Sequence, residues 1–434
     1  MSREQWDFWI DRGGTFTDIV ARDPEGALHS KKLLSENPER YEDAALQGIR
    51  EFLRLGGAET IPLARIASVK MGTTVATNAL LERKGAKTVL VTTKGLADQL
   101  RLGYQHRPDD QLFAREIVLP EQLYDRVIEA DERVMADGTV LTTLDEARLA
   151  ADLARAKADG FEAAAVVFVH GYRHTAHEAR AGDLARKAGF AQVSVSHAVS
   201  PLMKMVSRGD TTVVDAYLSP ILRRYVDRVA AAFDGDPVGK LMFMMSSGGL
   251  TDAQRFQGKD AILSGPAGGV VGGAKTAEIA NLPQVLGFDM GGTSTDVWRY
   301  DGEYERVLHT EIAGVRMRAP MMHIHTVAAG GGSILRFDGQ RMRVGPESAG
   351  ANPGPAAYGR GGPLAVTDAN VMTGKLRPEF FPAIFGPDGD RPLDIAATRA
   401  RFEAVAAEID KSPEAVDWPR HVAYLGGRGA GAWG

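Results

Sequence analysis

The sequence contains no cysteine among its 434 residues. This absence excludes disulfide bonds, thiolate zinc sites and a cysteine nucleophile, and it fits a reducing compartment. An excess of charge of one sign is also missing: the formal net charge is -5, the pI is about 6.1, and no block of five or six like charges occurs. A chain without a basic field is not expected to bind nucleic acid.

Long apolar runs are absent as well. The opening residues, MSREQWDFWIDRGG, hold no apolar stretch long enough for a signal peptide, and nowhere do eighteen apolar residues run together. Because a membrane-spanning helix needs about 20 such residues, we expect a cytoplasmic protein with no membrane contact. The composition, 44% hydrophobic and 25% charged, is that of an ordinary globular chain, and its length predicts at least two domains.

Short β-branched runs alternate with alanine-rich, charged stretches along the chain, which predicts an α/β fold. Residues 145–159 place Leu149, Leu153 and Ala156 on one side of an amphipathic helix. Residues 209–233 predict a second helix, beginning at an Asp210 N-cap and interrupted by Pro220. We expect this second helix to bridge two lobes.

Glycine is abundant, with 49 residues, and one glycine-containing string occurs twice. DRGGTFTD occupies residues 11–18 and DMGGTSTD occupies residues 289–296, so that six of eight positions match when the first aspartates are aligned. Each copy follows an apolar residue and precedes Ile or Val. One interpretation is a pair of structural β-hairpin turns, because Gly-Gly between extended runs is a standard hairpin signal.

Phosphate binding accounts for more of the string. Glycine lets backbone N–H groups approach phosphate oxygens, threonine hydroxyls add donors, and successive N–H groups form an anion nest. An aspartate at the strand end would repel phosphate unless a cation lay between them, so Asp11 and Asp289 are predicted to hold Mg²⁺ or its waters. The repeat therefore predicts a cleft for ATP and Mg²⁺. The predicted phosphate donors are Gly13, Gly14, Thr15, Gly291, Gly292 and Thr293.

Other glycine-containing stretches are weaker candidates for the same cleft. Gly72, Thr73 and Thr74 stand between a predicted strand and a predicted helix, whose N-terminus could face phosphate or the substrate carbonyl. A threonine N-cap alone is an equal alternative. SGPAGG at 264–269 and AGGGS at 329–333, which includes Gly331 and Gly332, would line the cleft through their backbones or permit tight helix packing.

Three charged or titratable side chains leave alternatives open. Arg12 could meet a substrate carboxylate, but it is equally well interpreted as a surface arginine in a turn. His323 and His325 have the spacing of two metal ligands on one face of a strand. We favour a structural role for them, because no third ligand is evident. Thr17, Asp18, Thr295 and Asp296 are expected to stabilise the two hairpins.

Neither a P-loop nor a Rossmann fingerprint is convincing in this sequence. The paired hairpins instead resemble the two phosphate motifs of the actin, hexokinase and sugar-kinase superfamily of ATPases. More narrowly, FWIDRGGTFTDIVARDPEG, MGTTVATNALLERKGA, RGDTTVVDAYLSPIL, LSGPAGGVVGG, FDMGGTSTDV and HTVAAGGGSI are similar, in this order, to the hydantoinase A/5-oxoprolinase family. The resemblance runs from about residue 8 to about residue 395.

This resemblance implies a two-lobed actin/hexokinase-like α/β fold with ribonuclease-H-like lobes. We expect residues 1–205 to form the lobe with the first hairpin, residues 206–410 the lobe with the second, and residues 411–434 an atypical tail that leaves the second lobe truncated. The implied substrate is a small cyclic amide, 5-oxo-L-proline, opened to L-glutamate with ATP. The resemblance also implies a hydantoinase B-type subunit or domain as partner, and we expect an oligomer.

Two other functions stay open beside this one. The chain could be the A subunit of a related ATP-dependent hydantoinase or ketone carboxylase. It could instead be an inactive nucleotide-binding remnant, because the position of the adenosine-binding loop in actin-like ATPases falls at or beyond residue 434.

Overall fold

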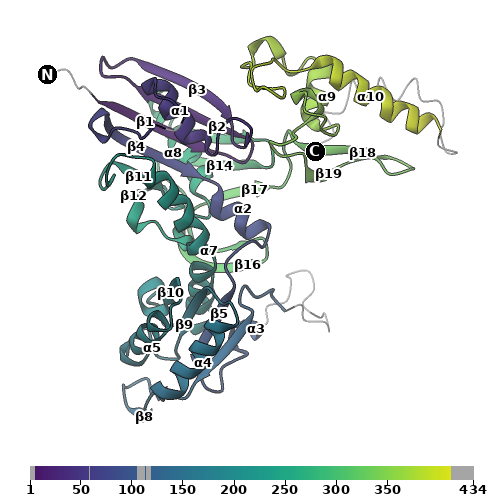
Figure 1. Ribbon diagram of the computed structural model, residues 1–434. Helices are drawn as coiled ribbons and strands as arrows, with labels where there is room; N and C mark the ends of the chain where they lie inside the picture. The colour runs from purple at the N-terminus through teal and green to yellow at the C-terminus, as the bar shows by residue number, and fades with distance from the viewer. Residues whose placement is uncertain (1–4, 58, 105–112, 114–118, 412–434) are drawn as a thin grey trace.

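A computed structural model describes residues 5–57, 59–104, 113 and 119–411 (Figure 1). Its largest sheet contains β1 (Trp6–Arg12), β2 (Phe16–Arg22), β3 (Leu28–Leu34), β4 (Ile66–Thr73), β11 (Leu241–Met244) and β12 (Leu250–Asp252). The strand order is β12-β11-β4-β1-β2-β3. β1, β2 and β3 form an antiparallel meander, whereas β4 and β11 run parallel to β1.

A helix covers one face of this sheet. α1 (Ala44–Leu53) is strongly amphipathic and begins where the Asp43 carboxylate accepts the N–H of Leu46 at 3.0 Å. Phe8 and Ile10 of β1 are buried in the main core together with Ile49 of α1. The Phe8 and Ile10 side chains of β1 are therefore shielded from water.

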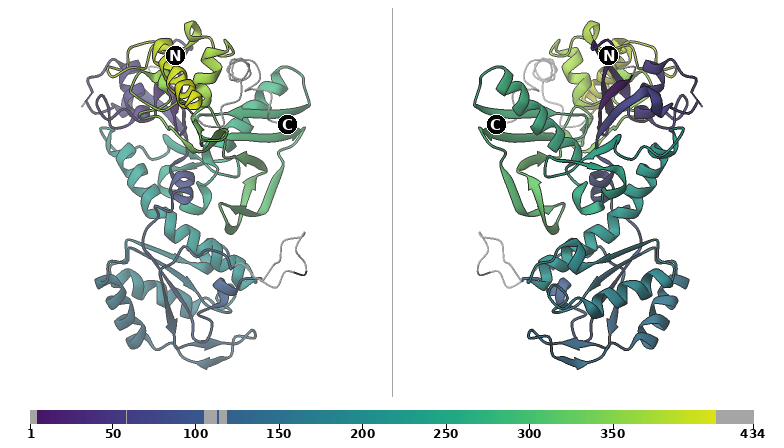
Figure 2. Two further views of the ribbon diagram at one scale, coloured as in Figure 1. Left: turned by 90° about the vertical axis from the view of Figure 1, so that its right-hand side faces the viewer. Right: turned by 90° about the vertical axis from the view of Figure 1, so that its left-hand side faces the viewer.

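A second sheet forms a separate parallel subdomain at the bottom of the molecule (Figure 2). Its strands are β5 (Thr88–Thr93), β6 (Arg126–Ala130), β9 (Ala163–Val167) and β10 (Gln192–Val195), in the order β10-β9-β5-β6. The segments around them include α3 (Gln99–Leu102), α4 (Glu146–Ala158), α5 (Ala176–Lys187), α6 (Ser196–Val199), β7 (Arg133–Val134) and β8 (Val140–Thr142). α2 (Val75–Leu81), between β4 and β5 in the chain, lies above this subdomain in Figure 1. The predicted amphipathic helix is confirmed as α4, with Leu149, Leu153 and Ala156 buried.

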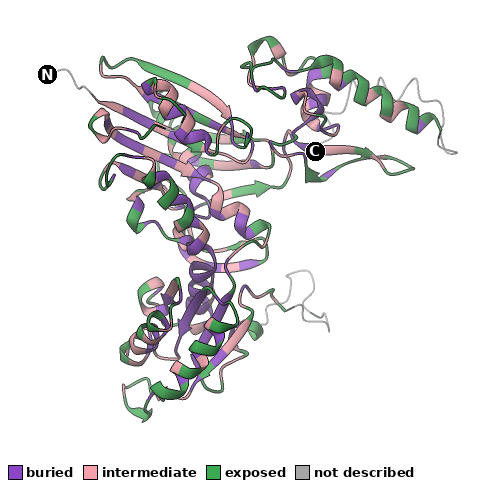
Figure 3. Cartoon of the chain, viewed as in Figure 1, coloured by how far each residue is buried: buried purple, intermediate pink, exposed green. Residues whose placement is uncertain are grey.

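One long helix, α7 (Met205–Ala231), joins this subdomain to the main sheet, and most of its residues are buried (Figure 3). The predicted N-cap at Asp210 is wrong, because the helix begins at Met205 and Asp210 lies inside it. The Asp210 carboxylate instead lies 3.2 Å from Arg316 Nη2. The helix also continues through Pro220, so the proline does not end it.

The second hairpin lies in a smaller sheet beyond α8 (Ser264–Ile279). This antiparallel sheet has the order β13-β14-β17, with β13 (Gln284–Met290), β14 (Thr295–Asp301) and β17 (Ile324–Val327). Two ribbons accompany it: β15 (Arg306–Ile312) with β16 (Val315–Met322), and β18 (Ser333–Phe337) with β19 (Met342–Ser348). α8 contacts strands of both sheets.

The last described segment returns to the first sheet. It contains α9 (Val366–Met372) and α10 (Ile395–Asp410). Its aromatic side chains Tyr358 and Phe385 lie with ring centroids 6.1 and 6.3 Å from that of Phe16, the first residue of β2. This small core therefore holds the segment against the strand that leaves the first hairpin turn.

The predicted division at residue 206 stays a prediction, and β11 and β12 from beyond that residue complete the sheet of β1. Of the predicted tail 411–434, residues 412–434 lie outside the described part of the chain. No helix within the described ranges is long and apolar enough to cross a membrane.

Candidate functional site

Both copies of the repeated string form the same β-hairpin. Asp11 pairs with Asp18 across β1 and β2, and Asp289 pairs with Asp296 across β13 and β14. The turns are closed by equivalent bonds, from Gly13 N–H to the Phe16 carbonyl at 3.0 Å and from Gly291 N–H to the Ser294 carbonyl at 2.9 Å. The prediction that each copy of the string forms a β-hairpin turn is therefore confirmed.

The two turns lie directly against each other. A Cβ added at Gly292 would lie 2.0 Å from Thr15 Oγ1, and one added at Gly14 would lie 3.3 Å from Thr293 Oγ1. With the copies aligned, Gly14 corresponds to Gly292 and Thr15 to Thr293, so each turn makes the same contact with the other. The fold thus brings together two strings whose first aspartates are 278 residues apart.

Several backbone N–H groups of these turns are free. Within the described part of the chain, the N–H groups of Gly14, Thr15, Gly292 and Thr293 make no hydrogen bond. The Thr15 hydroxyl is also buried without a partner there. Thr15 is buried, and buried polar groups are normally paired. The unpaired groups of the two turns are therefore candidates for binding an anion.

The carboxylates at the strand ends flank α8. A Cβ at Gly265 would lie 3.4 Å from Asp11 Oδ1, and one at Gly269 would lie 4.0 Å from Asp289 Oδ2. These glycines are four residues apart and share one helix face. Gly273, one turn further on, lies against the Trp298 ring, which a Cβ would approach to 2.4 Å. The glycines of SGPAGG therefore let α8 approach both hairpins.

The electrostatic surroundings of Asp11 are strongly acidic. Its side chain is open to solvent, yet protein crowds it on several sides. This partial desolvation, followed by the negative charges of Asp18, Asp289 and Asp296, raises the pKa of Asp11 to about 6, and Lys32 opposes the shift. A cation near Asp11 would relieve the repulsion.

The aspartates at the far ends of the two strings face the same side as Asp11 and Asp289. Directly paired residues of an antiparallel hairpin share a face, so Asp18 and Asp296 contribute to the negative field. Asp18 also pairs with Lys32 Nζ at 2.6 Å, and Asp296 accepts the Thr326 hydroxyl at 2.6 Å. From the sequence we expect Asp18 and Asp296 only to stabilise the hairpins, but the hairpin register also places them in this acidic cluster.

The end of β4 joins the first hairpin. Gly72 pairs with Asp11, and a Cβ at Gly72 would lie 3.2 Å from Asp11 Oδ1. Thr73 N–H donates to the Ser264 hydroxyl at 3.1 Å, and Thr74 N–H donates to the Arg12 carbonyl at 3.2 Å. Thr74 is the N-cap residue of α2, but its side chain makes no capping bond. These residues connect β1, β4 and α8 beside Asp11.

The Gly331–Gly332 backbone supports the second turn from behind. Gly331 N–H donates to the Gly291 carbonyl at 2.9 Å, and Gly332 N–H donates to the Gly292 carbonyl at 2.6 Å. Thr367 in turn donates to the Gly331 carbonyl through both its N–H and its hydroxyl. Both glycine amides are therefore engaged in holding the turn, and their predicted contact with phosphate remains a prediction.

Arg12 lies away from the turns, on the core side of β1. Its Nε is 3.8 Å from Asp43 Oδ2, and its guanidinium carbon is 5.2 Å from the centroid of the Tyr225 ring. Neither Arg12 Nε nor the Tyr225 hydroxyl has a hydrogen-bond partner among the described residues. The carboxylate that faces Arg12 in the described structure is therefore that of Asp43.

Histidines form no metal centre with other ligands in the described ranges, where no group of three His, Cys, Asp or Glu residues is placed to hold a metal ion. His323 lies 3.4 Å from Glu305. A metal at the hairpins would therefore take one or two carboxylates and complete its shell with water and phosphate, as Mg²⁺ commonly does.

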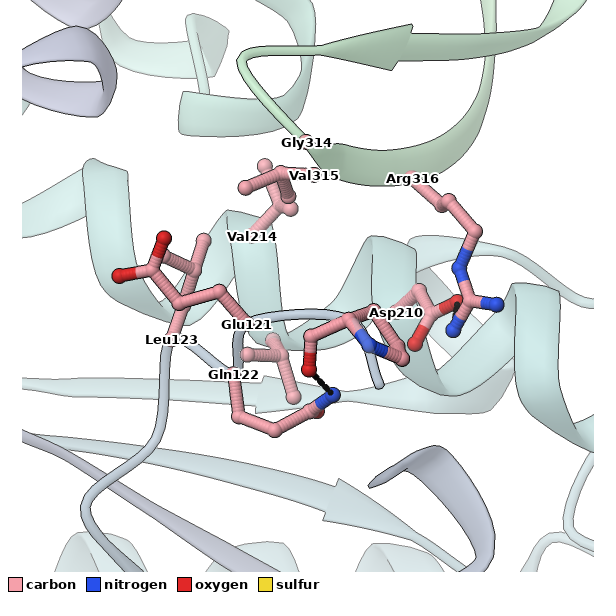
Figure 4. A pocket seen from close by; sticks show the side chains of 10 residues that line it. Glu121, Gln122, Leu123, Asp210, Val214, Gly314, Val315 and Arg316 are labelled. Carbon is pink, nitrogen blue, oxygen red and sulfur yellow. Dashed lines mark hydrogen bonds and ion pairs between the residues drawn. The ribbon is translucent and has the colours of Figure 1, made fainter. Parts of the chain in front are cut away.

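A small cavity of about 20 Å³ lies elsewhere, between residues 120–123, α7 and the start of β16 (Figure 4). Asp210 and Arg316 face each other at its wall. Burial raises the pKa of Asp210 to about 7, while Arg316 opposes the shift. Asp210 is about 22 Å along α7 from Tyr225, which contacts Arg12. The cavity is therefore separate from the hairpins.

Two family models match the chain: the hydantoinase/oxoprolinase N-terminal region over residues 7–189 and hydantoinase/oxoprolinase over residues 208–424. The chain belongs to the hydantoinase/oxoprolinase family. It is 46% identical to 5-oxoprolinase 1 of Arabidopsis thaliana over 93% of this chain and 34% of that protein. It is 36% identical to the caprolactamase subunit alpha of Pseudomonas jessenii over 87% of this chain and 55% of that protein.

Two solved structures share the fold. A nucleotide-free acetone carboxylase matches 96% of this chain with a TM-score of 0.76 at 24% identity. The ATP-dependent caprolactamase from Pseudomonas jessenii matches 96% with a TM-score of 0.68 at 33% identity. The predicted family and its actin-like α/β fold are confirmed. The chain spans about a third of the length of 5-oxoprolinase 1.

Proposed function

We propose that this chain binds Mg-ATP at the paired hairpins and phosphorylates the lactam carbonyl of 5-oxo-L-proline, as its part in ATP-dependent hydrolysis to L-glutamate. The observation that carries the proposal is the reciprocal contact of the two turns, with unpaired amides on both. The 5-oxoprolinase name of a 46% identical relative supports the substrate.

The chemistry explains why ATP is needed. A lactam is a resonance-stabilised amide that resists water. Transfer of the γ-phosphoryl group to the carbonyl oxygen releases ADP and gives an imidate phosphate. Water then adds to that carbon and the ring C–N bond breaks, which leaves the γ-carboxyl group as an acyl phosphate. A second water hydrolyses the acyl phosphate and releases phosphate, so that L-glutamate, ADP and phosphate form from 5-oxoproline, ATP and two waters. We assign the water-adding step to a hydantoinase B-type subunit or domain.

The backbone amides and the carboxylates of the two hairpins have different roles in this proposal. The amides of Gly14, Thr15, Gly292 and Thr293 would hold phosphate oxygens, since phosphoryl transfer depends mainly on positioning and charge neutralisation. Asp11 and Asp289 would hold Mg²⁺ or its waters, and that cation neutralises phosphate charge when bound. The acidic field that raises the pKa of Asp11 fits a cation there.

Calorimetry with Mg-ATP tests the site on the 434-residue chain. Asp11→Asn and Asp289→Asn should each weaken binding at least tenfold without lowering the unfolding midpoint. Asp301→Asn is the matched control, because Asp301 pairs with Gln284 at the far end of the second hairpin. Wild-type affinity in both site variants would defeat the assignment.

A second activity has a specific observation in its favour. The caprolactamase subunit alpha is 36% identical, so a larger lactam is a competing substrate. ADP release with a B-type partner, compared for 5-oxoproline, caprolactam, hydantoins and ketones, separates these activities. If Mg-ATP binds but none of these compounds stimulates ADP release, the result favours an inactive remnant.

A further inference from the structure

Strand β13 has an open edge. Among the described strands its sheet runs β13-β14-β17, so β13 has β14 as its one neighbour. The aligned strand of the first copy, β1, lies instead between β2 and the parallel strand β4. The two hairpins have the same pairing register, so the side of β13 that corresponds to the β4 side of β1 is unpaired.

The outer face of β13 is bare as well. Leu286, Phe288 and Met290 alternate along the strand and are 79%, 72% and 46% exposed. With the copies aligned, Leu286 corresponds to Phe8 and Phe288 to Ile10, which are 0% and 4% exposed. Equivalent positions are thus core in one copy and open in the other.

The other face of the same strand is partly covered, since Val285 and Gly287 are half-buried although Asp289 is exposed. α8 lies against Asp289 through Gly269 and against Trp298, the partner of Gly287 in β14. A strand with one partly covered face, one bare apolar face and an open edge is a docking surface for another polypeptide segment.

We propose that β13 and its outer face bind a strand and a helix from the polypeptide that follows this region in the longer relatives. This chain spans 34% of 5-oxoprolinase 1, so that relative carries further polypeptide. The strand would pair parallel to β13, as β4 pairs with β1. The helix would cover Leu286 and Phe288, as the core around α1 covers Phe8 and Ile10.

The first copy also sets a condition on the docked strand. Gly72 of β4 pairs with Asp11, whose Oδ1 would lie 3.2 Å from a Cβ there. The residue that pairs with Asp289 should therefore be glycine or another small residue, which leaves the carboxylate accessible. A second copy of this chain is a poorer occupant, because two-fold symmetry pairs identical strands antiparallel.

Co-expression tests this inference without any assay of ATP. The tagged 434-residue chain is produced with the polypeptide that follows the matched region in Arabidopsis 5-oxoprolinase 1. We expect a 1:1 complex and slower hydrogen exchange in residues 284–290. Phe288→Asp and Leu286→Asp should weaken the complex at least tenfold, whereas Leu308→Asp, an exposed leucine on β15, should leave it intact. Unfolding midpoints check that all three variants fold.

Three results would overturn the inference. The first is no complex, and the second is a complex that Phe288→Asp leaves unchanged. The third is protection, in the chain alone, of those amides of residues 284–290 that do not face β14, which would mean that a second copy or the chain itself already covers the open edge of β13. Because the measurement is independent of nucleotide, failure of the proposed ATP site leaves it unaffected.

Discussion

Gly292→Ala is the sharpest test of the contact between the two turns. The added Cβ would lie 2.0 Å from Thr15 Oγ1 and 2.8 Å from Thr15 Cβ, whereas ordinary contacts begin at 3.4 Å. Rotation of the Thr15 side chain does not move its Cβ, so the turns must move apart. Overpacking of this kind costs about 1–3 kcal/mol of unfolding free energy. Because a displacement of about 1 Å in positioning groups can cost on the order of 100-fold in rate, we expect a loss of similar order in Mg-ATP affinity, measured by calorimetry.

The neighbouring glycine supplies the control. A Cβ at Gly291 would lie 3.4 Å from the Ser294 carbonyl oxygen, an ordinary contact. Neither Gly291 nor Gly292 has a positive φ, so alanine fits the backbone at both. Gly291→Ala should therefore change affinity by no more than roughly twofold, as benign substitutions do.

A double-mutant cycle isolates the contact itself. Thr15→Gly removes the side chain that the new Cβ would strike, so it should recover at least half of the stability that Gly292→Ala loses, as measured by urea unfolding. The expected coupling energy is about 1–2 kcal/mol. Equal effects of the two alanine variants, or additive effects in the cycle, would show that the turns do not touch in solution.

Three further predictions concern single carboxylates. Mg-ATP should bind more tightly as the pH rises from 5 to 7, because Asp11, with its pKa near 6, must ionise to hold a cation; Asp11→Asn should flatten this dependence in calorimetry. Asp210 has a native pKa of about 7 against 3.8 unfolded, so the native state keeps its proton longer and wild-type stability should fall between pH 4 and pH 7. Urea unfolding of Asp210→Asn should lack that decline. Asp368 is fully buried and accepts three backbone N–H groups and the Thr398 hydroxyl; Asp368→Ala should cost about 3 kcal/mol, and a loss below about 1 kcal/mol would contradict that role.

Local features could be predicted where the sequence pattern is itself local. The helix from Glu146 to Ala158 follows from its apolar spacing and its Asp145 cap, which accepts the Arg148 N–H at 3.0 Å. The start of α7 could not be found in this way. Aspartate is a common N-cap residue, which is why Asp210 looks like a helix start. Its carboxylate instead pairs with Arg316, more than a hundred residues later in the chain.

The candidate site likewise has some features that could be predicted from the sequence and others that could not. Asp11, Asp289 and the glycine turns were recognisable because one string occurs twice. The surroundings depend on long-range packing: Asp43 near Arg12, and Gly265 and Gly269 beneath the carboxylates, come from distant segments. No periodicity around those residues indicates which strand end they will face.

The duplicated string gains a second explanation from the contact that it makes. Gly13 and Gly291 donate the bonds that close their own turns. Gly14 and Gly292 leave room for the threonine of the opposite turn. The contact is reciprocal, so a side chain added to the second glycine of one copy must be matched by a smaller residue at the threonine of the other. Similarity between the copies is therefore required by packing as well as by any shared phosphate.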